Sequence, residues 1–293
     1  IRLFPHNFEN QDVLQYELLI TNNPEVNFST DYHGNRVGNF NTLEAHAEMT
    51  IESRMLVRVN HSLKIPDFEH SYVNDLVAEK EKNINLLRLC YPETITKQDT
   101  ILDILNEIGC ENKTIIEIAQ QCNNYIFNHF TYTKGITNIE TTVDEILDHK
   151  KGVCQDFAHV LLQLVRTAGI PARYVSGYIC PNESGLRGEG ATHAWVEIYT
   201  PNQGWLGIDP TNNIWTMDNH VKLAVGRNFI DCTPVKGTFK GVAKQTLSVC
   251  VSIGYEDGRH FEEINDVALE EVSSEIQEQL DYIELLQQQQ QQQ

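Results

Sequence analysis

The sequence predicts an α+β fold with an antiparallel β-domain at the N-terminus. Apolar and polar residues alternate between residues 45 and 59, which is the period of a half-buried strand. After Pro66 the apolar residues instead recur at three- and four-residue steps, which favours helices. Strand-like segments return at 172–179 and 194–199, so helices precede a sheet in the second part of the chain.

The N-terminal β-domain is expected over residues 1–65. In the segment AHAEMTIESRMLVRV one face carries Met49, Ile51, Met55, Val57 and Val59, and the other carries Thr50, Glu52, Arg54 and Arg58. Turn-forming residues separate the short strands before it, at Asp31, Gly34, Asn35 and Gly38.

The larger part, residues 66–255, is expected to hold the helices and the main sheet. Helical spacing is found at 72–77, 101–108, 113–130 and 152–169. A turn at 201–204 follows the strand predicted at 194–199 and predicts a hairpin with the next strand.

The last part, residues 256–293, is expected to be an acidic amphipathic helix and a glutamine run. Between Glu256 and Glu284 there are eleven acidic residues and one basic residue, Arg259. The helical apolar positions are Leu269, Val272, Ile276, Leu280, Ile283 and Leu286, before the low-complexity run Gln287–Gln293. A helix docked on its own domain with a solvated polar face is the favoured interpretation, and self-association through this helix stays an alternative.

Composition excludes several classes of function. A chain of 293 residues with 22 basic and 41 acidic side chains has a formal charge of -19, which would repel nucleic acid and anionic membrane surfaces. The seven cysteines form no CxxC pair and no zinc-ligand spacing, and no run has the apolar length of a membrane span or a signal segment. We therefore expect a cytoplasmic protein without a structural metal.

Cys154 is the candidate nucleophile. It stands in the segment KGVCQDFAH, and apolar residues at helical spacing follow it, so it falls in the first turn of a buried helix. The helix dipole and the free backbone N–H groups of that turn favour a thiolate and can hold a developing oxyanion. Gly152 is expected to let the chain turn sharply and expose the sulfur.

His193 and Asp209 are the candidate partners of this thiol. A thiolate needs an acid–base partner, and His is the side chain suited to that task. His193 opens the alternating segment HAWVEIY, and Asp209 ends the next predicted strand. Adjacent strands would place the carboxylate beside the imidazole, where it fixes the tautomer and orientation of the ring.

These segments resemble the transglutaminase-like superfamily at several points along about sixty residues. The matching blocks, in the family's order, are GVC at 152–154 with DFAH at 156–159, AGIPARYVSGY at 168–178, HAWVE at 193–197, GW at 204–205 and DPTN at 209–212. Upstream, FTY at 130–132 and residues 141–147 resemble the segment before the nucleophile helix. Leu3, Pro5, Gln11, Asp31, Gly34, Asn35 and Val37 resemble the N-terminal β-domain of a bacterial branch, and 226–231 with Pro234 and Gly237 resembles its C-terminal sheet.

The resemblance implies a papain-like core, with Cys154 as nucleophile, His193 as general acid and base, and Asp209 as the orienting carboxylate. It implies attack on a carboxamide or peptide carbonyl of a peptide or protein, a thioester intermediate, and release by an amine or by water. No cofactor is implied, and without an acidic calcium loop no calcium activation is expected. Transglutaminase, cysteine protease or amidase, and a non-catalytic binding protein that keeps the fold stay open.

Other residues near these blocks have weaker assignments. Tyr132 is a candidate oxyanion donor, and Thr192 departs from the Ser that often precedes the family's His. Asp156 and His159 are interpreted as capping and structural groups. The aromatic residues Trp195, Trp205 and Tyr178 are expected in the core more than in a substrate groove.

Overall fold

The computed structural model describes residues 1–5, 7–8, 10–60, 70–137, 141–180, 186–187, 192–238 and 246–255, and the backbone of 260–268. The chain divides into two compact units, Ile1–Lys236 and Gly237–Gln293. The N-terminal strands and the following helices and sheet all belong to the first unit. The division at residues 65 and 255 expected from the sequence stays a prediction.

The N-terminal β-domain consists of two pairs of antiparallel strands. Strand β1 (Gln11–Ile20) pairs with β4 (Ile51–Val59), and β2 (Asn27–Thr30) pairs with β3 (Arg36–Asn39). The strand predicted from residue 45 begins only at Ile51, which is the partner of Ile20 at the end of β1. Beyond that point β1 gives way to a turn in which Asn22 and Asn23 have positive φ, so the earlier residues lack a pairing strand.

Eight helices of the first unit are described. They are η2 (Val73–Leu76), α1 (Val77–Lys82), α2 (Ile84–Cys90), α3 (Gln98–Ile108), α4 (Ile115–His129), α5 (Val143–His149), α6 (Cys154–Thr167) and α7 (Phe229–Cys232). The predicted helices at 101–108, 113–130 and 152–169 correspond to α3, α4 and α6. Thr114 caps α4 by accepting the N–H of Glu117, whose carboxylate accepts the N–H of Thr114.

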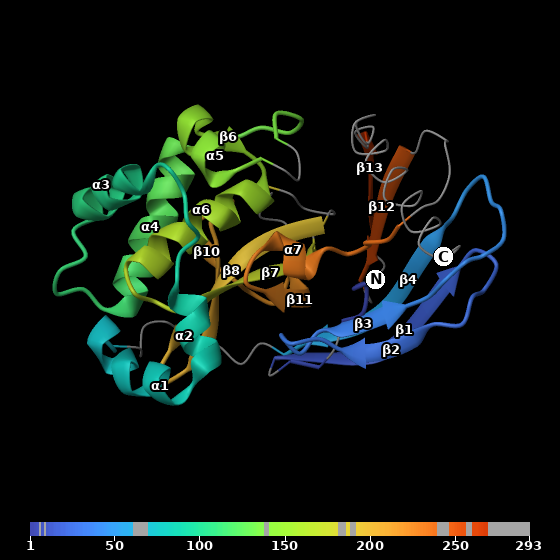
Figure 1. The fold of residues 1–293 in the computed structure, drawn as a ribbon, viewed down its shortest axis with the longest axis horizontal. Helices are drawn as coiled ribbons and strands as arrows, with labels where there is room; N and C mark the ends of the chain where they lie inside the picture. The colour runs from blue at the N-terminus through green and yellow to red at the C-terminus, as the bar shows by residue number, and fades with distance from the viewer. Residues whose placement is uncertain are drawn as a thin grey trace, which may run out of the picture. The chain divides into compact units, whose positions relative to one another are not determined.

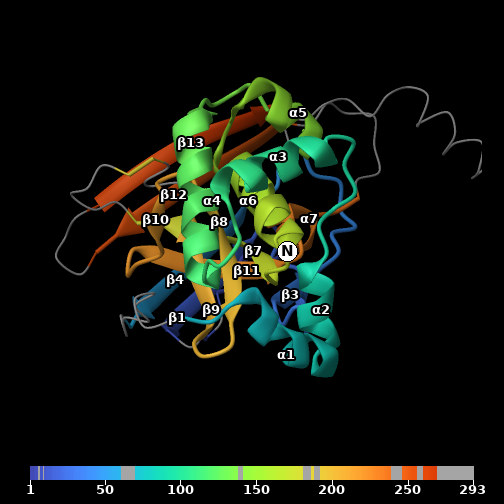
Figure 2. The ribbon, with the colours of Figure 1, turned by 90° about the vertical axis from the view of Figure 1, so that its left-hand side faces the viewer.

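A five-stranded antiparallel sheet forms the platform of the main domain. Its strands lie in the order β10 (Ile214–Trp215), β9 (Gly204–Asp209), β8 (Thr192–Thr200), β7 (Ala172–Ile179) and β11 (His220–Gly226). Helix α6 packs on β7 and β8, and α4 packs against α6 and contacts β9 (Figures 1 and 2). A short parallel pair, β5 (Thr131–Tyr132) and β6 (Lys151–Gly152), lies just before α6 in sequence.

The N-terminal domain completes the outer edge of this sheet. The buried amide of Asn35 donates to the carbonyl of Val225 at 2.7 Å and accepts the N–H of Val225 at 2.8 Å. The Gln11 amide does the same with the carbonyl and N–H of Lys222, at 2.8 Å each. These side chains therefore satisfy backbone groups of β11 that an edge strand otherwise leaves open.

In the second unit, β12 (Thr246–Gly254) and β13 (His260–Ala268) form an antiparallel pair. This corrects the start of the predicted acidic helical tail, because residues 260–268 pair along their whole length with β12. The predicted helix at 269–286 and the glutamine run lie outside the described residues. The match of 226–231 to a C-terminal sheet also needs correction, since Gly226 ends β11 and α7 begins at Phe229.

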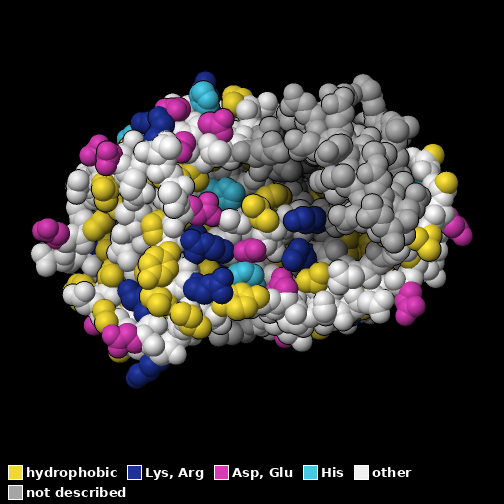
Figure 3. All heavy atoms as spheres, in the orientation of Figure 1, with side chains coloured by type: hydrophobic (Ala, Val, Ile, Leu, Met, Phe, Trp, Pro, Cys, Tyr) yellow, Lys and Arg dark blue, Asp and Glu magenta, His cyan; other side chains and the backbone are white. Residues whose placement is uncertain are grey.

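On the face shown in Figure 3, acidic side chains of the described residues are scattered among apolar and basic ones, so the acid excess forms no single patch there. Within the described ranges, none of the helices combines the length and the apolar character that crossing a bilayer would need.

Candidate active site

Cys154 is the first residue of α6, and its thiol is partly buried and free. The first bond within the helix runs from the N–H of Phe157 to the carbonyl of Val153. The N–H groups of the residues between them therefore have no acceptor inside the helix. The structure thus places the predicted nucleophile at the helix terminus where anions are stabilised.

Asp156 fixes the start of this helix. Its carboxylate accepts the N–H of Val153 at 2.7 Å and the hydroxyl of Thr137 at 2.6 Å. Burial raises the pKa of Asp156 and outweighs these two hydrogen bonds, which lower it. A Cβ added to Gly152 would lie 2.4 Å from a carboxylate oxygen of Asp156. Gly152 is therefore needed for close packing against the cap, rather than for the sharp turn expected from the sequence.

His193 and Asp209 form a buried pair on neighbouring strands. His193 is the second residue of β8 and Asp209 is the last of β9. The Nε2 atom of His193 lies 2.9 Å from Oδ2 of Asp209, and neither side chain is exposed to solvent. The predicted hairpin thus brings these two residues into hydrogen-bonding contact.

Cys154 is the second group, after Asp209, that raises the pKa of this imidazole. Because Nε2 faces Asp209, Nδ1 is the ring nitrogen left for the thiol. This Nδ1 is buried and makes no hydrogen bond of standard geometry, but the Cys154 side chain is close enough to influence the pKa of His193. Contacts of this kind are often loose before substrate binds.

The electrostatics favour a charged His193. Burial lowers the pKa of His193, but the Asp209 carboxylate and the Cys154 side chain together raise it well above its ordinary value of 6.5. Burial likewise raises the pKa of Asp209, and the charge of His193 and its hydrogen bonds outweigh burial and lower it. The pair is therefore held as imidazolium and carboxylate near neutral pH.

Four N–H groups converge on Asp209. Besides His193, its carboxylate accepts the backbone N–H of Thr211 at 2.8 Å and the amide of Asn212 at 2.7 Å. The fourth is His220, whose Nε2 lies 3.6 Å from Oδ2. The sequence reasoning missed His220, because nothing in its local pattern separates it from the other ten histidines.

His193, Asp209 and His220 also have the spacing of a three-ligand metal site. Their ligand atoms lie within 4.8 Å of one another. A carboxylate has about four lone-pair directions; three N–H groups donate to Asp209, and the fourth direction faces Nε2 of His220 at 3.6 Å. We therefore assign this cluster to hydrogen bonding, and the expectation of no metal stays a prediction.

The other residues named from the sequence, which are Tyr132, His159 and two tryptophans, lie in different surroundings. Tyr132 pairs with Gly152 across β5 and β6, two residues from the nucleophile, and its role as an oxyanion donor stays a prediction. His159 accepts the N–H of Phe229 at 3.3 Å, and burial lowers its pKa to about 4, as befits a structural group. Trp195 is in the core, whereas Trp205 is half-buried beneath the guanidinium of Arg173.

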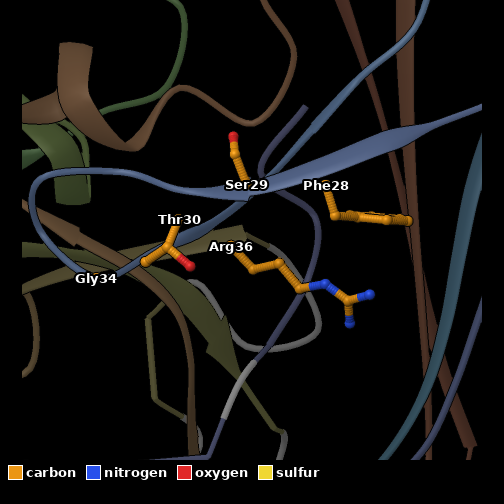
Figure 4. A pocket seen from close by; sticks show the side chains of 5 residues that line it. All are labelled: Phe28, Ser29, Thr30, Gly34 and Arg36. Carbon is orange, nitrogen blue, oxygen red and sulfur yellow. The ribbon is translucent and has the colours of Figure 1, made fainter.

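A hollow of about 360 Å³ lies on the N-terminal domain and is not lined by any residue of the candidate site (Figure 4). Its lining residues are Phe28, Ser29, Thr30, Gly34 and Arg36. The Arg36 guanidinium lies 4.2 Å from the centre of the Phe28 ring, so it is engaged in a cation–π contact. These residues do not provide a nucleophile with a base beside it, so Cys154 remains the candidate nucleophile.

Fold and site together define a protein with a cysteine at the start of a helix and a hydrogen-bonded histidine and aspartate on the antiparallel sheet against which that helix packs. Residues 103–210 match the model of the transglutaminase-like superfamily, and residues 1–58 match that of the bacterial transglutaminase-like N-terminal region. The chain belongs to the transglutaminase-like superfamily and has the N-terminal domain of its bacterial branch, as the sequence predicted.

The relatives found extend over most of the chain. Uncharacterised proteins of Mycobacterium tuberculosis and Mycobacterium leprae are each 30% identical, over 80% and 76% of this chain and 79% of their own length. A protein-glutamine gamma-glutamyltransferase of Pseudomonas aeruginosa is 39% identical over 30% of this chain and 14% of its own. The crystal structure of a provisionally named cysteine protease from Cytophaga hutchinsonii, 19% identical, has a TM-score of 0.62 over 92% of this chain and 85% of that one. This likeness supports the α+β fold.

Proposed function

We propose that the protein is a thiol-dependent enzyme that cleaves amide bonds of peptides or proteins through a Cys154 thioester. The observation that carries this proposal is the meeting of three distant groups. The thiol at the start of α6 raises the pKa of an imidazole whose Nε2 is 2.9 Å from a buried carboxylate, and this supports the proposal. A core histidine serving only stability would not need a thiol on one side and a carboxylate on the other.

The proposed first step forms a thioester. The Cys154 thiolate attacks the carbonyl carbon, and the C–N bond breaks as the His193 imidazolium donates its proton to the leaving nitrogen. An amine or amide-derived ammonia departs, and His193 is left neutral. The free N–H groups at the start of α6 stabilise the oxyanion of the tetrahedral intermediate.

The second step regenerates the enzyme. Neutral His193 takes a proton from the acceptor, which attacks the thioester carbonyl. The C–S bond then breaks and the thiolate returns beside the imidazolium. Asp209 keeps the ring oriented through both steps and balances its charge when it is protonated.

The acceptor distinguishes the two enzymatic alternatives. With an amine the protein is a transglutaminase, as the matched Pseudomonas relative is named, and with water it is a protease or amidase. A glutamine-containing peptide offered with a fluorescent amine separates them. Amine capture indicates transfer, whereas ammonia release without capture, or backbone cleavage, indicates hydrolysis.

Cys154→Ala is the control in each assay. The Cys154→Ala variant should release no ammonia, capture no amine and cleave no backbone. If a broad peptide library shows no turnover by the parent that this variant lacks, the chain is a binding protein that keeps the fold, and the proposed function is rejected. A cytoplasmic location, and the absence of nucleic-acid and membrane partners, stay predictions.

A further inference from the structure

His220 lies at the end of the sheet where the candidate site is built. The four residues between β10 and β11 carry the chain from one edge of the sheet to the other, past the end of β9 and the start of β8. His220 is the first residue of β11, is 5% exposed, and reaches Asp209 although its strand is not a neighbour of β9.

The position of the proton on His220 follows from the groups around both ring nitrogens. At Nδ1 the backbone N–H of Met217 donates at 3.2 Å, whereas Oδ1 of Asn219, at 2.9 Å, can only accept, so these two contacts favour opposite tautomers. Burial lowers the pKa of His220 and outweighs the Asp209 carboxylate, so a neutral ring is favoured. We place its single proton on Nε2, because an unprotonated Nε2 would turn a lone pair toward the buried Asp209 carboxylate 3.6 Å away.

That proton points to one acceptor. Nε2 is buried and has no hydrogen-bond partner within 3.5 Å among the described residues, and Oδ2 of Asp209 lies 3.6 Å away. The Trp195 ring meets the His220 ring edge to face, with centroids 5.3 Å apart and planes at 83°, which holds the imidazole in this orientation. The groups charged or titratable around it are Asp209, His193 and the nearby Asp218.

We propose that His220 is a positioning residue of the proposed reaction, which holds the Asp209 carboxylate in place by its Nε2–H. The inference rests on the proposed function. Asp209 must stay oriented while His193 gains and loses a proton in each step. Thr211 and Asn212 donate hydrogen bonds to the carboxylate from the residues that directly follow Asp209, whereas His220 approaches it from strand β11. When His193 is neutral, the donor on His220 keeps a proton directed at the carboxylate, so the pair does not have to rearrange.

The test compares His220→Gln with His220→Leu. The Gln amide nitrogen can occupy the position of Nε2–H, whereas Leu fills similar space without a donor. We expect His220→Leu to lower kcat for amide cleavage about 10- to 100-fold with little change in KM, on the scale of losing an orienting second partner, and His220→Gln to stay within about threefold of the parent. The Leu variant should also shift the alkaline limb of the pH–rate profile, because the carboxylate that raises the pKa of His193 loses a neighbouring donor.

His159→Leu is the matched control, because it removes another partly buried histidine, whose ring lies 5.3 Å from that of Tyr174 in the same sheet. It should lower thermal stability without moving that limb. Equal effects of Leu and Gln at position 220, or an unmoved limb in the Leu variant, would overturn the positioning role. So would loss of activity on dialysis against a chelator with recovery on adding zinc, because the three residues would then hold a metal.

A second readout keeps this inference separate from the proposed function. The pH profile of iodoacetamide alkylation of Cys154 reports the thiolate–imidazolium pair without any amide substrate. If the parent cleaves no amide, the proposed function fails, and the Leu variant must still shift this alkylation profile. If the parent is active and His220→Leu leaves the alkylation profile unshifted, the positioning role of His220 is rejected and the proposed function is not.

Discussion

Asp209→Asn should dismantle the charge arrangement around His193 while leaving the shape of the site intact. Coulomb's law gives about 6 kcal/mol for unit charges 2.9 Å apart at an effective dielectric constant of about 20. Burial of both charges offsets part of this gain, so we expect about a 10³-fold fall in kcat, or about 4 kcal/mol. Without the carboxylate the raised pKa of His193 should fall back.

The same substitution should change the pH range in which the thiolate–imidazolium pair exists. The folded pKa of His193 is raised above its ordinary value, so the pair persists from neutral into alkaline pH and disappears as the pH rises through that raised pKa. In Asp209→Asn this alkaline limb should move to lower pH. Iodoacetamide alkylation of Cys154 followed from pH 5 to 11 measures it directly.

Asp103→Asn is the matched control, because Asp103 is an exposed residue of α3. It should leave both kcat and the alkylation profile unchanged. If Asp209→Asn keeps full activity and an unmoved alkaline limb, then Asp209 does not support the charge of His193 and the triad is rejected.

Three further predictions concern the thiol, the buried acid and the helix cap. Cys154 should react with iodoacetamide faster than the exposed Cys250 at neutral pH, and equal rates would remove the support for an ion pair with His193. Glu197→Gln should destabilise the fold by about 3 kcal/mol near neutral pH, because it removes the buried charge with which the partly buried Arg173 and Lys222 form ion pairs. Burial raises the pKa of Glu197, but those two cations outweigh burial and lower it from 4.5 to about 2. The loss of stability caused by Glu197→Gln should therefore shrink as the pH falls from about 4.5 towards 2. Chemical denaturation at several pH values measures it, and a loss that does not depend on pH would contradict the prediction. Gly152→Ala should lower Tm and slow Cys154 alkylation by displacing Asp156, whereas Gly237→Ala, whose added Cβ meets no atom within 4 Å, should do neither.

Local patterns were sufficient for most of the helices and strands. The apolar spacing of α4 and α6 and the alternation of β8 are signals contained in about fifteen consecutive residues. The strand predicted from residue 45 was too long for a different reason, since the length of a strand depends on its partner. Residue 51 pairs with the last residue of β1, and the residues before it have no strand to join.

The second unit shows the same limit. The acidic composition after residue 255 favours a solvated segment, but pairing with β12 makes residues 260–268 a strand. Backbone hydrogen bonds to a partner strand outweigh a weak local preference. The family relationship, by contrast, could be predicted in full, because its motifs are short blocks in a fixed order.

The sequence by itself determined the order of the three candidate residues, the type of element that carries each, and the family to which the chain belongs. The tertiary structure alone decided which ring nitrogen of His193 faces Asp209, how deeply the pair is buried, and that His220 reaches the same carboxylate. The physical reason is that hydrogen bonds and burial depend on distances across strands. A contact between residues of two strands that are not neighbours in the sheet leaves no periodic signal in the sequence.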